Sequence, residues 1–182
     1  MSIREDTKDR SDIMDGKILV AYASKYGATA EIAEKIGEVL KQEGLQADVL
    51  PVKSVKNLTD YKDVVIGSAM YLGMWRREGA NFLKKNEKLL TERRVWIFST
   101  GPSGKGDPVE LLKGVRVSFN VKSIIERIKP RDTAVFHGNI DEKKMNLWEK
   151  WMVKTAKGEM GDFRDWDMIT GWAKGVAEAV KK

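Results

Sequence analysis

The chain has 182 residues and a formal net charge of +6, lacks cysteine, and carries one histidine, His137. This length fits one domain with a sizeable core, since single domains commonly span about 100–200 residues. The lack of cysteine excludes disulfides, iron–sulfur clusters, thiolate zinc sites and a cysteine nucleophile, and a single histidine argues against a histidine-rich metal site or a Ser-His triad. No metal site is predicted, so any redox chemistry would need a bound organic cofactor.

Residues 1–16 are polar, without apolar periodicity, and predict a flexible N-terminal extension before a domain over residues 17–182. The chain shows no signal-peptide pattern and no apolar stretch of about 18 residues or more, so we expect a cytoplasmic protein. The positive charge is concentrated: residues 76–131 hold 14 basic and 6 acidic side chains. This segment is either a solvated face or a surface that attracts nucleic acid, anionic lipid or an acidic protein.

The predicted elements alternate between short apolar runs, typical of buried parallel strands, and segments with helical spacing. The expected strands are 17–22, 46–51, 63–68, 95–99 and 133–137, and the expected helices are 28–43, 76–90, 121–128 and a C-terminal helix. In that helix Trp166, Ile169, Ala173, Val176, Ala177 and Val180 form one stripe, interpreted as core. The order predicts an α/β domain with a doubly wound five-stranded parallel sheet and helices on both faces.

Ligands of such sheets bind beyond the carboxyl ends of the strands. After the first strand comes the loop Ser24-Lys25-Tyr26-Gly27-Ala28-Thr29, in which two hydroxyls bracket a glycine at the start of a helix. Backbone N–H groups at this positive helix end, together with the hydroxyls, can hold a phosphate. The alternative is a simple helix N-cap, with the glycine turning the chain.

Two further loops of small residues follow the third and fourth strands, namely Gly67-Ser68-Ala69-Met70-Tyr71-Leu72-Gly73-Met74-Trp75 and Ser99-Thr100-Gly101-Pro102-Ser103-Gly104. Such loops can hold a flat polar ring through backbone groups, with Tyr71 or Trp75 stacked on it, although either aromatic could instead pack in the core. A phosphate at one end and a planar heterocycle at the other describe a mononucleotide. His137, at the end of the fifth strand, is interpreted as a structural residue.

The SKYGAT loop resembles the phosphate loop of the flavodoxin-like FMN-binding fold at Ser24, Tyr26, Gly27 and Thr29, and the element order agrees over residues 17–182. The GSAMYLG loop, the FST segment and the tail from Trp148 through Gly161-Asp162-Phe163-Arg164-Asp165-Trp166 resemble the menaquinone-dependent protoporphyrinogen dehydrogenase family and its flavodoxin-domain relatives. The loop after the fourth strand differs from the pattern of the quinone-linked enzymes.

This resemblance implies FMN as the cofactor. The hydroxyls of Ser24 and Thr29 and the backbone of 25–29 would hold its phosphate, while 68–73 and 99–104 would lie along the isoalloxazine, with the backbone of 69–71 beside N5. The candidate cofactor-binding residues are therefore Ser24, Lys25, Tyr26, Gly27, Ala28, Thr29, Ser68, Ala69, Met70, Tyr71, Leu72, Gly73, Ser99, Thr100, Gly101, Pro102, Ser103 and Gly104.

An additional helical segment, 141–160, lies between the fifth strand and the last helix. Met145, Trp148, Met152 and Ala156 share one side, the lysines gather on the opposite side, and Leu147 and Trp151 lie at the boundary. A basic amphipathic helix with such tryptophans over 143–157 can lie on an anionic membrane, where a quinone would be met. The alternative is that its apolar side packs on the domain or on a second subunit.

The leading functional hypothesis is an FMN-dependent oxidoreductase that passes electrons between the flavin and a small organic substrate or quinone. The alternative is a flavodoxin that carries electrons between protein partners, but shuttle flavodoxins are acidic as a family, whereas this chain is basic. A nucleic-acid binder is ranked below both, because the chain carries no recognised nucleic-acid motif. A homo-oligomer is left open.

Overall fold

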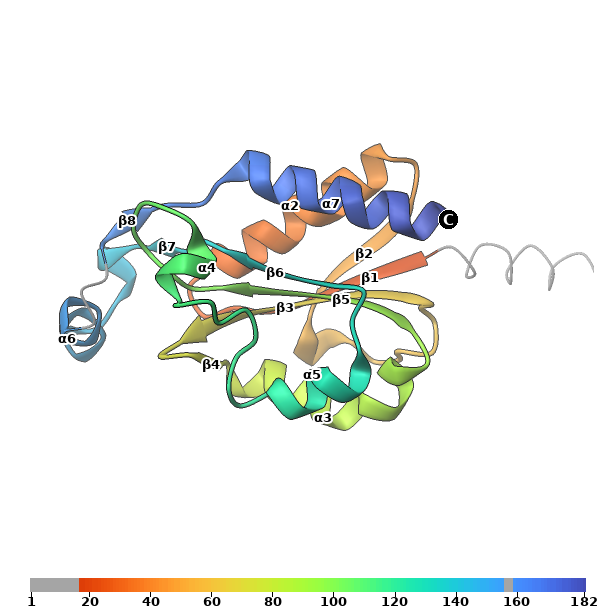
Figure 1. Ribbon diagram of the computed structural model, residues 1–182, viewed down its shortest axis with the longest axis horizontal. Helices are drawn as coiled ribbons and strands as arrows, with labels where there is room; N and C mark the ends of the chain where they lie inside the picture. The colour runs from red at the N-terminus through yellow and green to blue at the C-terminus, as the bar shows by residue number, and fades with distance from the viewer. Residues whose placement is uncertain (1–16, 156–158) are drawn as a thin grey trace, which may run out of the picture.

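The computed structural model describes residues 17–155 and 159–182, so the predicted extension 1–16 and part of the segment 141–160 lie outside the described residues. Five parallel strands form a sheet in the order β2-β1-β3-β5-β6 (Figure 1). Their bounds are β1 Lys17–Ala23, β2 Gln46–Pro51, β3 Asp63–Tyr71, β5 Arg94–Thr100 and β6 Asp132–Phe136. The predicted doubly wound α/β fold is confirmed.

Helices cover both faces of this sheet, as Figure 1 shows. On one side lie α2 (Ala28–Gln42) and α7 (Trp166–Lys181), and on the other lie η1 (Val52–Ser54), α3 (Arg77–Thr91) and α5 (Lys122–Ile128). Alternate residues of a strand point to opposite faces, so in β1 Ile18 and Val20 pack toward α2 and α7, whereas Leu19 and Ala21 pack toward the other layer. Strands buried on both sides explain the continuous apolar runs in the sequence.

The core constrains one strand position to glycine. A Cβ at Gly67 in β3 would lie 1.9 Å from the ring of Phe98 in β5, so no larger residue fits without moving that ring. Phe98 in turn packs against Phe136 of β6 and Trp172 of α7, with ring centroids 5.9 and 6.2 Å away. Because Phe98 lies against Gly67, this aromatic cluster packs on β3, the strand that leads into the second predicted loop.

That second loop differs from the sequence expectation, because β3 does not end at Ser68. It runs on to Tyr71, turns at Leu72 and Gly73, and returns as the short antiparallel strand β4 (Met74–Trp75). Leu72 and Gly73 have φ values of 50° and 76°, which a tight hairpin turn requires. The predicted loop is therefore a β-hairpin, held because Ala69 still pairs with Thr100 of β5.

The C-terminal stripe is confirmed except at its first member. Ile169, Ala173, Val176 and Ala177 are buried, but Trp166 is 38% exposed and the prediction that it belongs to the core is wrong. Trp166 is the first residue of α7, beyond the part of the helix that covers the sheet, and its ring lies 4.7 Å from the Arg164 guanidinium carbon.

The remaining elements gather at the end of the molecule where the parallel strands finish (Figure 1). They are α4 (Pro108–Leu111), β7 (Asn139–Ile140), η2 (Glu142–Lys144), α6 (Leu147–Thr155) and β8 (Gly161–Asp162), with β7 and β8 paired antiparallel. The described part of 141–160 is thus partly helical, as predicted. Among residues 17–155 and 159–182, no helix has the length and apolar character needed to cross a bilayer.

Candidate functional site

A cavity of about 370 Å³ opens at the carboxyl ends of the strands, next to the point where strand order reverses between β1 and β3. This is the position at which open α/β sheets bind ligands. All three loops predicted from the sequence contribute to it. Of the candidate residues, those on the cavity wall are Ser24, Lys25, Tyr26, Ala28, Thr29, Ala69, Met70, Tyr71, Leu72, Gly73, Thr100, Gly101, Pro102 and Ser103.

The first loop has the geometry of an anion cradle. Gly27 precedes α2 with a φ of 101°, which favours glycine, and its N–H donates to the Ser24 hydroxyl at 3.1 Å. No side chain caps the first turn of α2, so its N–H groups are left for another acceptor. A helix start without a cap, beside a cavity, fits a bound phosphate and disfavours the simple N-cap interpretation.

A pair of buried hydroxyls joins this first loop to the third. The Thr29 and Thr100 side-chain oxygens lie 2.6 Å apart, and both residues are 2% exposed. One hydroxyl donates to the other, and the acceptor keeps its own proton to offer to a ligand. The contact fixes the start of α2 against the end of β5 at the cavity wall.

The hairpin resolves which of the two aromatic candidates faces the cavity. Tyr71 is 42% exposed and lines the cavity, whereas Trp75 is only 3% exposed and packs in the core. The Trp75 indole N–H donates to the Ser99 hydroxyl at 2.8 Å, which satisfies both polar groups away from water. Of these two candidates, Tyr71 is therefore the side chain placed to contact a planar ligand.

Four candidate residues support the wall without forming it: Gly27, Ser68, Ser99 and Gly104 are absent from the cavity lining. Ser68 is fully buried, donates to the Ala69 carbonyl at 3.0 Å and accepts from the Arg76 N–H at 3.2 Å. These bonds hold the end of β3 against the start of α3. Ser99, near the end of β5, accepts a hydrogen bond from the Trp75 indole N–H and so holds β5 against the hairpin.

The third loop is held in place by His137. This residue is 6% exposed, and its Nδ1 and Nε2 lie 3.0 and 2.8 Å from the carbonyl oxygens of Pro102 and Gly106. A Cβ at Gly101 would lie 2.9 Å from the Met70 carbonyl oxygen, so the loop also lies close against the hairpin backbone. The arrangement agrees with the structural role expected for His137.

A fourth wall was missed by the sequence analysis. It consists of Leu111 and Leu112 at the end of α4 and of Gly138, Asn139, Ile140, Asp141, Met145 and Val153. The rule that directed attention to the ends of the other strands applies equally to β6, so the residues after Phe136 could have been included. Nothing in the sequence indicated that α4 would reach the cavity.

The segment that follows β7 also brings positive charge to the first loop. The Lys144 ammonium donates to the Tyr26 carbonyl oxygen of this loop at 3.3 Å. Glu31, in the first turn of α2, pairs with Arg164, whose side chain is only 6% exposed and also binds Asp162. Because Arg164 donates to the Asp162 carboxylate, the pKa of Asp162 lies below its usual value. The Arg164 guanidinium therefore bridges the carboxylates of Glu31 and Asp162.

These features define a flavodoxin-like α/β protein with a cavity at the carboxyl end of its sheet. The flavodoxin domain family model matches residues 19–167, and the chain belongs to this family. Because flavodoxin domains bind FMN, family membership confirms the cofactor predicted from the sequence.

Comparison with individual proteins agrees with this assignment. The chain is 23% identical over 178 residues to the protoporphyrinogen IX dehydrogenase [quinone] of Escherichia coli K12, covering 91% of this chain and 97% of that protein. Among solved structures, an archaeal flavodoxin matches with a TM-score of 0.61 and 14% identity over 91% of this chain and 99% of that one. Flavodoxin 2 from Bacillus cereus matches with a TM-score of 0.58 and 19% identity over 90% and 99%. The predicted fold is confirmed by both structures.

Proposed function

We propose that the protein is an FMN-dependent oxidoreductase that passes electrons between a small organic substrate or a quinone and the bound flavin. The first-turn N–H groups of α2, with the Ser24 and Thr29 hydroxyls, would hold the phosphate. The hairpin backbone at 69–73 and the loop 100–103 would hold the ring, with Tyr71 against it. When bound, FMN supplies two-electron and one-electron chemistry that no side chain of this chain provides.

The observation that carries this proposal is the apolar fourth wall. An electron carrier needs only an exposed flavin edge that a partner protein can approach. Here Leu111, Leu112, Ile140, Met145 and Val153 extend the cavity beyond the three loops that would hold the cofactor. Apolar walls with few polar groups are typical of sites that enclose an organic molecule.

The similarity to the Escherichia coli enzyme indicates what that molecule could be. We propose a reduced cyclic tetrapyrrole as electron donor and a quinone as acceptor. The tetrapyrrole loses two electrons and two protons in each round, and the quinone gains the same number on becoming a quinol, so the overall reaction is balanced. Both reactants are largely apolar, which suits the fourth wall.

The alternative function is a flavodoxin that shuttles electrons between proteins. It would require a partner complementary to a chain of net charge +6. The two functions differ in the acceptor that the reduced protein prefers. A basic carrier should reduce an acidic redox protein much faster than it reduces a quinone.

Anaerobic stopped-flow kinetics on the FMN-loaded protein distinguishes the two. We expect reduction of the flavin by a porphyrinogen and rapid reoxidation by a menaquinone analogue. Leu111→Asp, which puts a charge on the fourth wall, should raise the KM for the organic reactants without changing FMN affinity. Met168→Asp alters an equally exposed apolar residue outside this cavity and serves as the control. Rapid turnover with a protein acceptor alone would overturn the enzyme proposal.

A further inference from the structure

The most exposed apolar cluster among the described residues lies on α6. Leu147, Trp148 and Trp151 are 85%, 64% and 56% exposed. The two indole rings stack on each other, with centroids 5.0 Å apart and planes inclined by 25°. Figure 1 shows α6 at the end of the molecule, away from the helices that cover the sheet. Exposed large apolar side chains that gather in this way commonly mark an interaction surface.

The cluster does not pack on its own domain. The sequence places Trp148 on the same side of the helix as Met145, yet Met145 lines the cavity together with Asp141 and Val153, whereas Trp148 is exposed. The alternative in which this apolar side packs on the domain is therefore wrong for Trp148. One side of the segment forms a wall of the candidate flavin site, and the tryptophans face away from the core.

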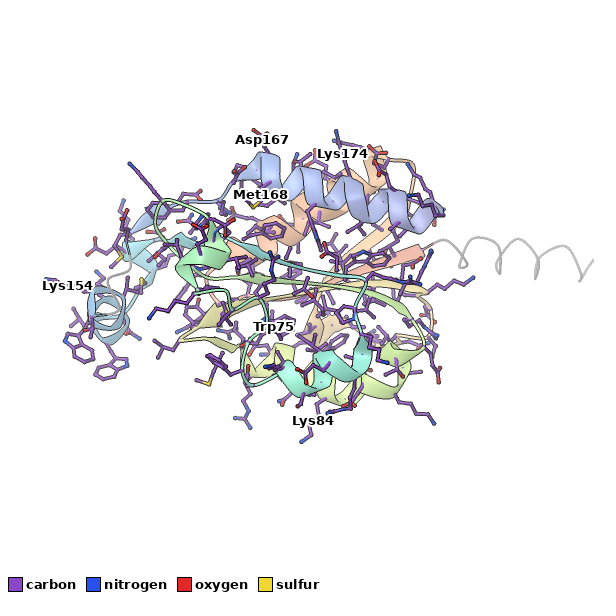
Figure 2. The ribbon with its side chains drawn as sticks, in the orientation of Figure 1. Trp75, Lys84, Lys154, Asp167, Met168 and Lys174 are labelled. Atoms are coloured by element: carbon purple, nitrogen blue, oxygen red, sulfur yellow. The ribbon has the colours of Figure 1, made fainter. Side chains whose placement is uncertain are left out.

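Lysines border this exposed cluster. On a helix, Lys150 and Lys154 lie three and seven residues after Leu147 and so share its side, next to Trp151. Lys154 is exposed, and Figure 2 shows it at the same end of the molecule, whereas Lys150 has Glu142 at 3.6 Å. Lys143 adds another exposed ammonium in the preceding turn. Over residues 141–157 the sequence holds five lysines and three acidic residues, so the segment has a positive net charge.

The neighbouring wall of the cavity has the same character. Leu111 is 43% exposed at the rim, and Lys105 and Lys113 are exposed in the same stretch of chain. Tryptophan and lysine together suit the boundary between headgroups and acyl chains, because the indole is amphipathic and the lysine stem can reach toward the headgroups. Positive charge around the cluster is complementary to anionic lipid.

A second copy of the chain is a less suitable occupant. The exposed parts of the two indoles and Leu147 amount to roughly 400 Å², given about 150–250 Å² for a fully buried aromatic side chain. A stable dimer needs about 800 Å² per subunit, and the lysines around the cluster would repel their counterparts across a two-fold axis. A bilayer imposes no such minimum area on a reversible contact.

We propose that α6 docks the protein on an anionic lipid bilayer, with Leu147, Trp148 and Trp151 inserted at the interface and Lys143, Lys150 and Lys154 toward the headgroups. Because Met145 and Val153 of the same segment line the cavity, docking places one wall of the site next to the bilayer. An apolar reactant dissolved in lipid could then reach the flavin without crossing water. The contact is peripheral and salt-sensitive.

Vesicle sedimentation tests this surface directly on the full-length, FMN-loaded protein. The probes are phosphatidylcholine vesicles with and without about one third phosphatidylglycerol, at low and at high salt. We expect binding to the anionic vesicles at low salt and little binding in the other conditions. The double variant Trp148→Ser with Trp151→Ser should lose about tenfold or more in affinity. Trp166→Ser removes a partly exposed tryptophan from another surface and should bind normally.

A charge-matched pair isolates the lysines. Lys154→Glu and Lys84→Glu change the net charge equally, but Lys84 lies on α3, far from α6 in Figure 2. Lys154→Glu should weaken vesicle binding by about tenfold or more and Lys84→Glu much less. Quenching of tryptophan fluorescence by brominated acyl chains should disappear in the double tryptophan variant.

Two results would overturn the proposal. One is absence of binding to anionic vesicles at low salt, or binding that both α6 variants leave unchanged. The other is a dimer in sedimentation equilibrium that the double tryptophan variant dissociates, which would assign the surface to a second copy. The inference rests on the proposed function only for the nature of the lipid-borne reactant. Since vesicle binding uses no redox reagent, failure of the membrane contact and failure of the oxidoreductase activity are observed separately.

Discussion

The hydroxyl oxygens of Thr29 and Thr100 lie 2.6 Å apart in the wall of the cavity, joining the start of α2 to the end of β5 across 71 residues of sequence. Thr29 lies in the first turn of α2, and Thr100 is the last residue of the central strand β5. The pair therefore sets the spacing between the phosphate cradle and the loop proposed to hold the flavin ring.

Replacing Thr29 by valine should weaken both stability and cofactor binding. The change keeps the shape of the side chain but leaves the buried Thr100 hydroxyl without its partner, at a cost of about 1–3 kcal/mol in the free energy of unfolding of the apoprotein. FMN affinity should also fall, because one hydroxyl donor to the phosphate is lost. Thr29→Ser should retain both properties. Chemical denaturation and flavin fluorescence titration measure the two effects.

A carboxylate at the same position should abolish FMN retention. Thr29→Glu places a negative charge against the phosphate cradle, and no cation of the first loop can neutralise both the added carboxylate and the phosphate. Gel filtration of the reconstituted variant should yield protein without flavin absorbance. Thr91→Glu, an exposed change at the end of α3, should retain the cofactor. Retention of FMN by Thr29→Glu would show that the phosphate binds elsewhere.

Lys144 provides a test of the anion that the cradle binds. Its ammonium lies 3.3 Å from the Tyr26 carbonyl oxygen, close to where a phosphate would lie. Lys144→Ala should weaken FMN binding by about tenfold through loss of a charge-assisted contact, yet leave riboflavin affinity unchanged because riboflavin has no phosphate. Calorimetric titration with each flavin measures the difference, and Lys143→Ala serves as the neighbouring control. Equal losses for both flavins would assign Lys144 to loop structure alone.

The fold could be predicted from the sequence because of the way its central strands are buried. Each central strand is buried on both faces and reads as an unbroken apolar run, and the three loops follow the ends of such runs. The burial of Trp75 could not be predicted from the sequence, because it depends on hydrogen bonds to groups distant in sequence. The Trp75 backbone N–H donates to the Ser118 hydroxyl at 2.7 Å, 43 residues later in the chain. The indole N–H donates to the Ser99 hydroxyl.

The orientation of the segment 141–157 could not be predicted from the sequence either. The spacing in 141–157 predicted a helical segment, but polarity alone left open whether its apolar side packs on the domain, on a second subunit or on a membrane. The direction of a helix of nine residues is decided by its connections, here the β7–β8 pair that anchors both flanks. The anchored segment turns Val153 toward the cavity and leaves Trp148 64% exposed.

Acid should destabilise the protein through the Asp162–Arg164 contact. The pKa of the Asp162 carboxyl is lowered in the folded state by hydrogen bonds from Arg164. A carboxyl with a depressed folded-state pKa contributes stability above its unfolded pKa of about 3.9, and this contribution is lost as the pH falls through the lower, folded value. Asp162→Asn should therefore flatten the decline of unfolding free energy below about pH 4. Denaturation curves at a series of pH values measure the slope, and an unchanged slope would contradict the assignment.

Tyr71 and Trp75 should respond in opposite ways to substitution. Trp75→Phe leaves the buried Ser99 hydroxyl without a donor and should cost about 1–3 kcal/mol in unfolding free energy, with the flavin spectrum unchanged. Tyr71→Ala removes a partly exposed side chain and should cost less than about 1 kcal/mol, but it should shift the flavin absorbance and reduction potential. Redox titration with absorbance detection, together with thermal unfolding of each apoprotein, measures both. A spectral shift in Trp75→Phe with none in Tyr71→Ala would mean that the hairpin turns over when the flavin binds, bringing Trp75 rather than Tyr71 against the ring.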